Sequence, residues 1–201
     1  MGLHSLDALP ALLEQALWLG GMAIVIALVS RPALDFRVRH WSGTVALGIG
    51  VFVLWIAPDL LFPGYRSHWL FSNGITGSVT KGLSDSDAVN LGVLTLRALR
   101  AVIIVPIIEE LFWRAWLLRW LILPDFSAVP LGTYAPQAFW IVAILFAAEH
   151  GPFWDVGLAC GILYNWWMVR TKSLGDLILA HSITNACLSA YVVAAGKWEY
   201  W

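Results

Sequence analysis

Two adjacent carboxylates and an arginine lie inside the otherwise apolar run PIIEELFWRAWLLRW, residues 106–120. If this run is a helix, Glu110 and Arg114 stand one turn apart on one face and can form an ion pair. Glu109 points about 100° away, because each residue turns a helix by that angle. An ionisable side chain at membrane depth is costly and indicates a functional site. The alternative is that Glu110 and Arg114 form an ion pair that only stabilises helix packing, but this does not account for Glu109.

A histidine closes another apolar run, 137–150, just before a Gly-Pro pair that ends a helix. Phe146 lies one turn before His150 on the same face, and Glu149 directly precedes the histidine. By itself, a histidine at a helix end is usually an interfacial or hydrogen-bonded residue. The run 137–150 therefore gives a candidate that needs support from elsewhere in the chain.

The last apolar run, 174–195, carries His181 and Asn185 four residues apart, and therefore on one face of a helix. Histidine and asparagine also serve as hydrogen-bonding groups between packed membrane helices, which is the structural alternative. Considered together with Glu109 and His150, the pair His181 and Asn185 is also a candidate for a functional site. Each polar group is unfavourable in lipid, so the helices should turn all of them toward one shared cavity.

Such a cavity would contain the groups needed to hydrolyse an amide. A carboxylate and a histidine can together hold and deprotonate a water molecule. A histidine and an asparagine can donate hydrogen bonds to the oxyanion that develops on the attacked carbonyl. Arg114 should keep Glu110 ionised, while Glu109 remains available as the base.

The composition predicts the elements that position these residues. The 201 residues are 60% hydrophobic and 12% charged, with a mean hydropathy of +0.75, which indicates an all-α polytopic membrane protein. Cys160 and Cys187 lie in apolar runs and predict no disulfide framework. We expect six membrane-spanning helices: 12–29, 45–57, 101–123, 137–150, 156–169 and 174–195.

Several signals concern the connections. Pro58 should end the second span, and the turn-rich segment 58–87 should be a connecting loop, although a lid or partner surface is also conceivable. Arg97 and Arg100 should separate a surface-lying or tilted segment from the third span. Pro106 should bend that span and leave the carbonyl of Val102 without its partner. Three tryptophans, Trp113, Trp116 and Trp120, share a face with Glu109 and form either helix packing or an aromatic wall beside the site.

Basic residues predict the orientation. The loops at residues 31–39 and 170–172 should be cytoplasmic, which places both termini of a six-span chain outside. His150 then lies toward the outer side and His181 nearer the inner side. The first ten residues contain no Lys or Arg, so we expect no cleavable signal peptide. The basic residues are too scattered for nucleic-acid binding, and no H-E-x-x-H or G-x-S-x-G motif is present.

The three motifs E109-E110-x-x-x-R114, F146-x-x-x-H150 and H181-x-x-x-N185 resemble, in order and spacing, those of the CAAX-protease and bacteriocin-processing (CPBP, or ABI) family. This family includes the type II CAAX prenyl endopeptidases. The resemblance covers residues 96–195, the protease core, which leaves 1–95 as an N-terminal two-span region and 196–201 as a short tail. It implies a glutamic-type intramembrane endopeptidase of a class formerly described as metalloproteases.

The resemblance also implies residue roles. Glu109 and His150 would activate water, and His181 and Asn185 would form the oxyanion hole. Glu149 is an additional acid for which the family implies no role. The supporting residues would be Glu110, Arg114 and Phe146.

A finer resemblance concerns the substrate. The stretch ELFWR, the DFxxVP stretch at 125–130 and the EH pair of the second motif are similar to a bacterial subgroup linked to exosortase-type C-terminal sorting. It implies an integral protein of the bacterial inner membrane. Its substrate would be a membrane-anchored protein with a C-terminal signal, processed within the lipid bilayer, rather than a prenylated CaaX tail.

Two other functions and a metal remain as alternatives. A scaffold or immunity protein could keep the fold and bind peptides without cleaving them, but it would not need a base. A proton- or ion-coupled transporter could use the buried Glu, Arg and His, although no internal repeat is visible. Glu109, His150 and His181 could bind zinc with an open position. We expect that no cofactor is required.

Overall fold

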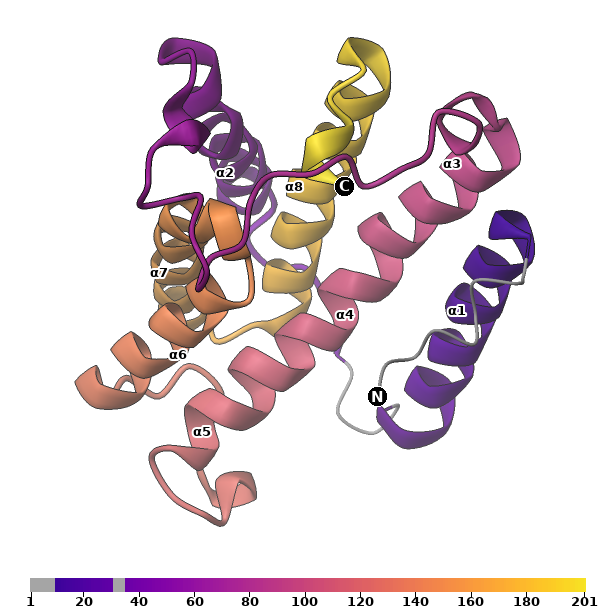
Figure 1. Ribbon diagram of the computed structural model, residues 1–201. Helices are drawn as coiled ribbons and strands as arrows, with labels where there is room; N and C mark the ends of the chain where they lie inside the picture. The colour runs from indigo at the N-terminus through magenta and orange to yellow at the C-terminus, as the bar shows by residue number, and fades with distance from the viewer. Residues whose placement is uncertain (1–9, 31–34) are drawn as a thin grey trace.

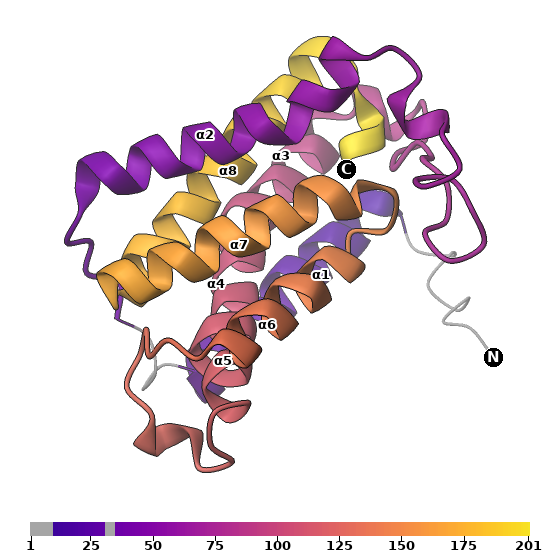
Figure 2. The same ribbon diagram turned by 90° about the vertical axis from the view of Figure 1, so that its left-hand side faces the viewer.

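The computed structural model describes residues 10–30 and 35–201 and forms a helical bundle (Figures 1 and 2). The all-α membrane fold is confirmed, and the described residues contain no strand beyond one isolated bridge. The expected absence of a signal peptide concerns residues that lie almost wholly outside the described ranges. The main helices are α1 (Ala11–Val25), α2 (Trp41–Leu61), α3 (Leu91–Leu99), α4 (Val105–Glu110), α5 (Leu118–Trp120), α6 (Pro136–Ala148), α7 (Trp154–Thr171) and α8 (Leu174–Ala195).

Four helical segments are long and apolar enough to cross a membrane, and α6 is a shorter apolar helix. The crossing segments are Ala11–Leu28, Trp41–Leu61, Leu91–Trp120 and Leu174–Ala195. The α7 helix, with 18 residues, carries Asp155, Asn165 and Arg170 and packs along α6. Among the described residues, four of the six expected spans are therefore confirmed as candidate membrane-crossing helices. The other two, α6 and α7, form a packed pair that is shorter or more polar than a standard span.

The longest helix runs without interruption through 30 residues, Leu91–Trp120. It contains α3, α4 and α5, joined by two π-helical segments, Arg100–Ile104 and Leu111–Leu117. No surface-lying segment ends at Arg97 or Arg100; of the two alternatives the structure favours the tilted one, because one long helix crosses the bundle obliquely (Figure 1). The second π-helical segment carries Arg114, and α4 between the two carries both glutamates.

The expectation that α2 ends at Pro58 is wrong, because the helix continues to Leu61. A proline removes one backbone donor but keeps its own carbonyl. The carbonyl of Pro58 accepts a hydrogen bond from Phe62 N at 3.0 Å, and the last helical turn forms after the proline. Near its middle, α2 approaches α8 closely: a Cβ on Gly48 would lie 2.6 Å from the Ala180 carbonyl oxygen. Small residues permit such close packing of membrane helices.

The loops gather at two opposite ends of the bundle. At one end, Asp176 of α8 accepts hydrogen bonds from the backbone of Arg39 and His40 at 2.6 and 3.2 Å. At the other end, Gly82 N donates to Trp198 O at 3.1 Å. This alternation of the loops is what six passes require. Residues 31–34 of the first basic loop lie outside the described residues.

The length of α6 explains how His150 reaches the depth of the other site residues. Thirteen residues rise about 20 Å, whereas a bilayer core is about 30 Å thick. The helix therefore stops inside the bundle, and its polar end carries His150. The segment 62–90 lies over the turn between α6 and α7, where Arg66 donates to Pro152 O at 2.8 Å and Trp154 donates to Leu70 O at 3.0 Å. The connecting-loop interpretation is confirmed, since this segment consists of turns with short 3₁₀ helices.

Candidate active site

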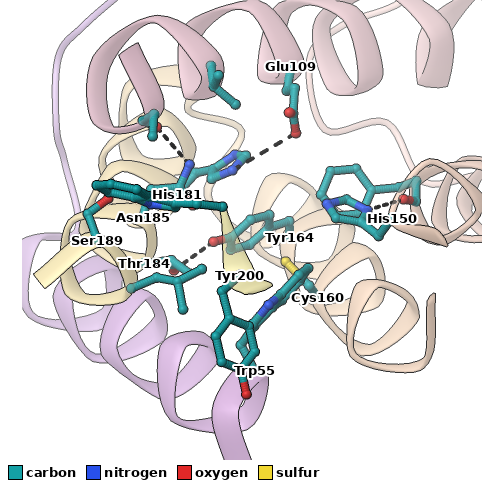
Figure 3. A pocket seen from close by; sticks show the side chains of 15 residues that line it. Trp55, Glu109, His150, Cys160, Tyr164, His181, Thr184, Asn185, Ser189 and Tyr200 are labelled. Carbon is teal, nitrogen blue, oxygen red and sulfur yellow. Dashed lines mark hydrogen bonds and ion pairs between the residues drawn. The ribbon is translucent and has the colours of Figure 1, made fainter. Parts of the chain in front are cut away.

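The four predicted catalytic residues line one cavity of about 170 Å³ that is partly open to the surface of the bundle (Figure 3). Glu109 comes from α4, His150 follows α6, and His181 and Asn185 come from α8. Phe146 also contributes to the lining. Three helices that are distant in the sequence thus turn their polar groups toward one space. This arrangement satisfies the requirement that such groups avoid lipid.

Glu109 faces His181 across part of this cavity. Glu109 Oε2 lies 4.0 Å from His181 Nε2, which is too long for a hydrogen bond. Among the described residues, Oε2 is buried without any hydrogen-bond partner. A carboxylate oxygen that lines a cavity and has no donor of its own is available to accept a proton from a bound molecule.

Glu110 has a different environment, since one of its carboxylate oxygens accepts two hydrogen bonds, although its Oε2, like that of Glu109, is buried without a partner among the described residues. Its Oε1 accepts hydrogen bonds from Arg114 at 3.1 Å and from His181 Nδ1 at 2.7 Å. The ion pair expected from the four-residue spacing is confirmed. Both its members are fully buried. The spacing gave no sign of the bond to His181, because that histidine is 71 residues away.

Arg114 is held by more than its carboxylate partner. Its Nε donates to Asn165 Oδ1 at 3.0 Å, and the Asn165 amide donates to Phe139 O at 2.9 Å. The guanidinium also lies over the Phe146 ring, 4.5 Å from its centroid, an attractive cation–π geometry. A continuous buried network therefore runs from α6 and α7 through Arg114 and Glu110 to the imidazole of α8.

His150 is oriented by its own helix. Its Nδ1 lies 2.6 Å from the carbonyl oxygen of Phe146, to which it donates. The centroids of the His150 and Phe146 rings are 4.8 Å apart. Because Nδ1 carries the proton in that bond, Nε2 of the neutral ring is the nitrogen with a free lone pair. Phe146 thus serves both neighbouring side chains, His150 and Arg114.

Asn185 is oriented by a consequence of Pro106. In the π-helical register before it, Val105 N donates to the Arg100 carbonyl, five residues earlier. The next donor in that register would be residue 106, which as proline has none. The carbonyl left over is therefore that of Ala101, and not that of Val102 as the α-helical register predicted. Asn185 Nδ2 donates to this Ala101 oxygen at 2.8 Å.

Glu149 and all three tryptophans lie outside the cavity lining. Glu149 Oε1 is 4.0 Å from His150 Nδ1, a nitrogen already engaged by Phe146. Trp116 and Trp120 stack on each other at 6.0 Å. Trp113, which is also absent from the lining, is buried against Phe146. Of the two interpretations of the tryptophans, the structure favours helix packing.

Several cavity residues carried no signal in the sequence. Tyr164 forms part of the inner wall, and its hydroxyl hydrogen-bonds Thr184 at 2.8 Å. Cys160 also lines the cavity. Trp55 and Tyr200 lie at the side of the cavity opposite Glu109 (Figure 3), and Trp201 also contributes to the lining. Aromatic residues are frequent in this chain, and only the tertiary fold selects those that reach the site.

The alternative zinc ligands do not form a ready metal site. Within residues 10–30 and 35–201, no three His, Cys, Asp or Glu side chains are grouped so that they could hold a metal ion together. His181 Nδ1 is occupied by Glu110, and His150 Nδ1 by the Phe146 carbonyl. Each ring keeps Nε2 for a further ligand, and histidines that bind a metal commonly make the same bonds through their other nitrogen, so these two bonds are compatible with either a water or a metal ion.

Residues 91–187 match the family model described as type II CAAX prenyl endopeptidase Rce1-like. No curated protein and no solved structure matches the chain. The matched segment is just under half of the chain and contains every predicted site residue. It also includes the long helix and most of α8, which together supply one side of the cavity. This match supports the assignment of residues 91–187 to the CAAX-protease (CPBP) family of membrane endopeptidases.

Proposed function

We propose that Glu109 and His150 activate a water molecule that cleaves a peptide bond in the cavity, which makes this a glutamic-type protease. Glu109 would take a proton from the water while the water oxygen bonds to the scissile carbonyl carbon. His150 Nε2 would accept a hydrogen bond from the same water. Glu109 would then pass the proton to the amine nitrogen as the C–N bond breaks. The unpartnered Glu109 oxygen on a cavity shared with two imidazoles is the observation that carries this proposal.

His181 and Asn185 would stabilise the oxyanion. His181 donates its Nδ1 proton to Glu110, so a donor at Nε2 requires the doubly protonated ring. The Glu110 carboxylate, 2.7 Å from Nδ1, faces the ring that would carry that charge. Asn185 uses one amide proton for Ala101, and the second remains for the oxyanion. Donors fixed in advance by such bonds are the basis of transition-state stabilisation in a buried site.

The substrate would be a membrane-anchored protein cleaved near its C-terminus, at a sorting signal rather than a prenylated CaaX sequence. Support comes from the cavity of about 170 Å³, since a cavity of about 150 Å³ holds one benzene molecule. It accommodates a side chain but not a prenyl chain. The resemblance to a bacterial sorting-linked subgroup agrees, and it suggests the bacterial inner membrane as the location.

The base is tested by replacing Glu109 with glutamine. Glu109→Gln keeps the size of the side chain but cannot accept the proton, so the cleavage rate should fall by about 10²–10⁴-fold with little loss of stability. The assay follows a membrane-anchored protein encoded beside this gene, with the products identified by mass spectrometry in detergent. Glu149→Gln is the matched control and should cleave at the wild-type rate.

The same assay separates the rival functions. Wild-type cleavage by Glu109→Gln would disprove the glutamic mechanism. If the wild-type protein cleaves nothing, flux measured in proteoliposomes would then distinguish a transporter from a peptide-binding scaffold.

Independence from metal is a separate prediction of this mechanism. Because hydrogen-bonding groups would supply all the chemistry, purified protein should keep full activity in strong chelator. Metal analysis of that same sample should find no stoichiometric zinc. Loss of activity in chelator, with recovery on adding zinc, would instead support Glu109, His150 and His181 as metal ligands.

A further inference from the structure

Aromatic residues from outside the family match line one side of the cavity, the side that faces away from Glu109. Trp55 comes from α2, and Tyr200 and Trp201 come from the tail that follows α8. Figure 3 shows Trp55 and Tyr200 side by side across the cavity from Glu109. Any substrate residue that reaches Glu109 must therefore fit beside these rings. We call Trp55, Tyr200 and Trp201 the outer wall.

The tail is folded back onto the bundle in a defined way. The α8 helix ends at Gly196, whose φ of 64° lies in the left-handed region that reverses the chain. The Trp198 carbonyl then accepts a hydrogen bond from Gly82 N at 3.1 Å. A Cβ on Gly82 would lie 1.6 Å from the Trp201 carbonyl oxygen, so only glycine permits this approach.

Tyr200 is fixed on two sides. Its hydroxyl donates to Asp59 Oδ2 at 2.8 Å, and its ring packs on Phe153 with centroids 5.3 Å apart. Burial and then the hydrogen bond to Asp59 raise the pKa of Tyr200, so the hydroxyl keeps its proton as a donor. Asp59 is in turn paired with Arg66 at 3.2 Å.

Arg66 connects this anchor to the His150 side of the site. It donates to Pro152 O at 2.8 Å, two residues after His150, and it also pairs with Asp155. Its guanidinium lies 4.6 Å from the centroid of the Phe153 ring. The outer wall and the turn that carries His150 are thus joined through one buried cluster, which fixes the distance between wall and site.

We propose that the outer wall is the specificity-determining surface of the cavity, and that it restricts the residue beside the scissile bond to small apolar side chains. This rests on the proposed protease function. Near Asn185 the lining is mostly apolar, with Ala101, Val105 and Leu188, while Thr184, whose hydroxyl is already hydrogen-bonded to Tyr164 and Gly48, and Ser189 add two small polar side chains. The cavity of about 170 Å³ must hold both the reacting peptide group and the neighbouring side chain. A small aliphatic side chain fills what remains, whereas an aromatic one would collide with Tyr200 or Trp201.

The first test needs no substrate, because Cys160 lines the same cavity. In a Cys187→Ser background, the rate at which a small methanethiosulfonate modifies Cys160 reports access past the outer wall. Tyr200→Ala and, independently, Trp201→Ala should raise that rate several-fold. Tyr200→Phe keeps the ring and should change it little. Trp69→Ala, which removes an exposed aromatic that does not line the cavity, is the matched control. Equal rates in wild type, Tyr200→Ala and Trp201→Ala would overturn the proposal.

The second test uses a single-span reporter whose residue beside the cleaved bond is alanine, leucine or phenylalanine. Wild-type protein should prefer alanine, and Tyr200→Ala should reduce that preference by at least about 10-fold, since a single methylene in an apolar pocket already changes discrimination by that much. An unchanged preference in Tyr200→Ala would overturn the selective role. If wild type cleaves no reporter, the proposed function fails, and the Cys160 rates alone decide whether the wall covers the cavity.

Discussion

Arg114 holds together the polar network behind the site. Its side chain is fully buried, pairs with Glu110 and donates to Asn165. Arg114→Ala would leave a buried carboxylate without its partner, which costs about 3–5 kcal/mol. We expect Arg114→Ala to lose both activity and stability, measured by thermal unfolding in detergent.

The outcome also tests whether Arg114 contacts substrate. Since none of its surface is exposed, a role as a substrate ligand would require a different arrangement. Arg114→Lys should recover part of the stability because it keeps the charge, although it lacks the forked geometry of arginine. A variant Arg114→Ala that was as stable as wild type yet inactive would contradict the buried-support role.

At the residue scale, the sequence predicted local relationships and missed distant ones. The Glu110–Arg114 pair follows from helical spacing alone, and the structure contains it. The bonds from Arg114 to Asn165 and from Glu110 to His181 join residues 51 and 71 positions apart. Such contacts depend on helix packing, which no spacing rule specifies.

At the scale of the helix, Pro106 explains the orientation of Asn185. Its missing N–H leaves the Ala101 carbonyl to the Asn185 side chain. Pro106→Ala would supply a backbone donor that competes for this oxygen and releases the amide. Proline is unfavourable by about 3 kcal/mol inside a helix, so we expect Pro106→Ala to be at least as stable as wild type but slower.

The effect of removing the Asn185 amide sets the scale for the loss of cleavage rate expected in Pro106→Ala. Asn185→Ala should lower the cleavage rate by about 10²–10³-fold if the amide donates to the oxyanion, and Pro106→Ala should approach the same value. The matched control is Pro58→Ala, which alters a proline inside α2, outside the cavity lining, and should leave the rate unchanged. Cleavage by Pro106→Ala at the wild-type rate would show that the proline does not position Asn185.

The expected bend at Pro106 illustrates what sequence rules capture at this scale. The sequence predicts that Pro106 leaves one carbonyl unpaired, but the α-helical register assigns this carbonyl to Val102. The π-helical segment Arg100–Ile104 shifts it by one residue to Ala101. Likewise, the sequence predicts a span at residues 137–150. Only the structure shows that this span is a short helix, α6, whose end is covered by the segment 62–90.

For the whole molecule, charge distinguishes the two ends of the bundle. Arg37 and Arg39 lie with Asp176 at the end where Ser173 donates to Arg37 O at 3.2 Å, and α7 brings Arg170 to that end. The positive-inside rule then makes this end cytoplasmic. The opposite end carries the tail and the outer wall. The cavity should therefore be reached from the outer side of the membrane.

Labelling of single cysteines checks this orientation in a Cys160→Ser, Cys187→Ser background. Asp85 is 92% exposed at the tail-bearing end, and Arg37 is exposed at the other. An impermeant maleimide on intact cells should label Asp85→Cys and spare Arg37→Cys, whereas both should react after lysis. If Arg37→Cys were the one labelled in intact cells, the orientation would be reversed. The outer wall would then face the cytoplasm, and the substrate would have to present its C-terminal region from that side.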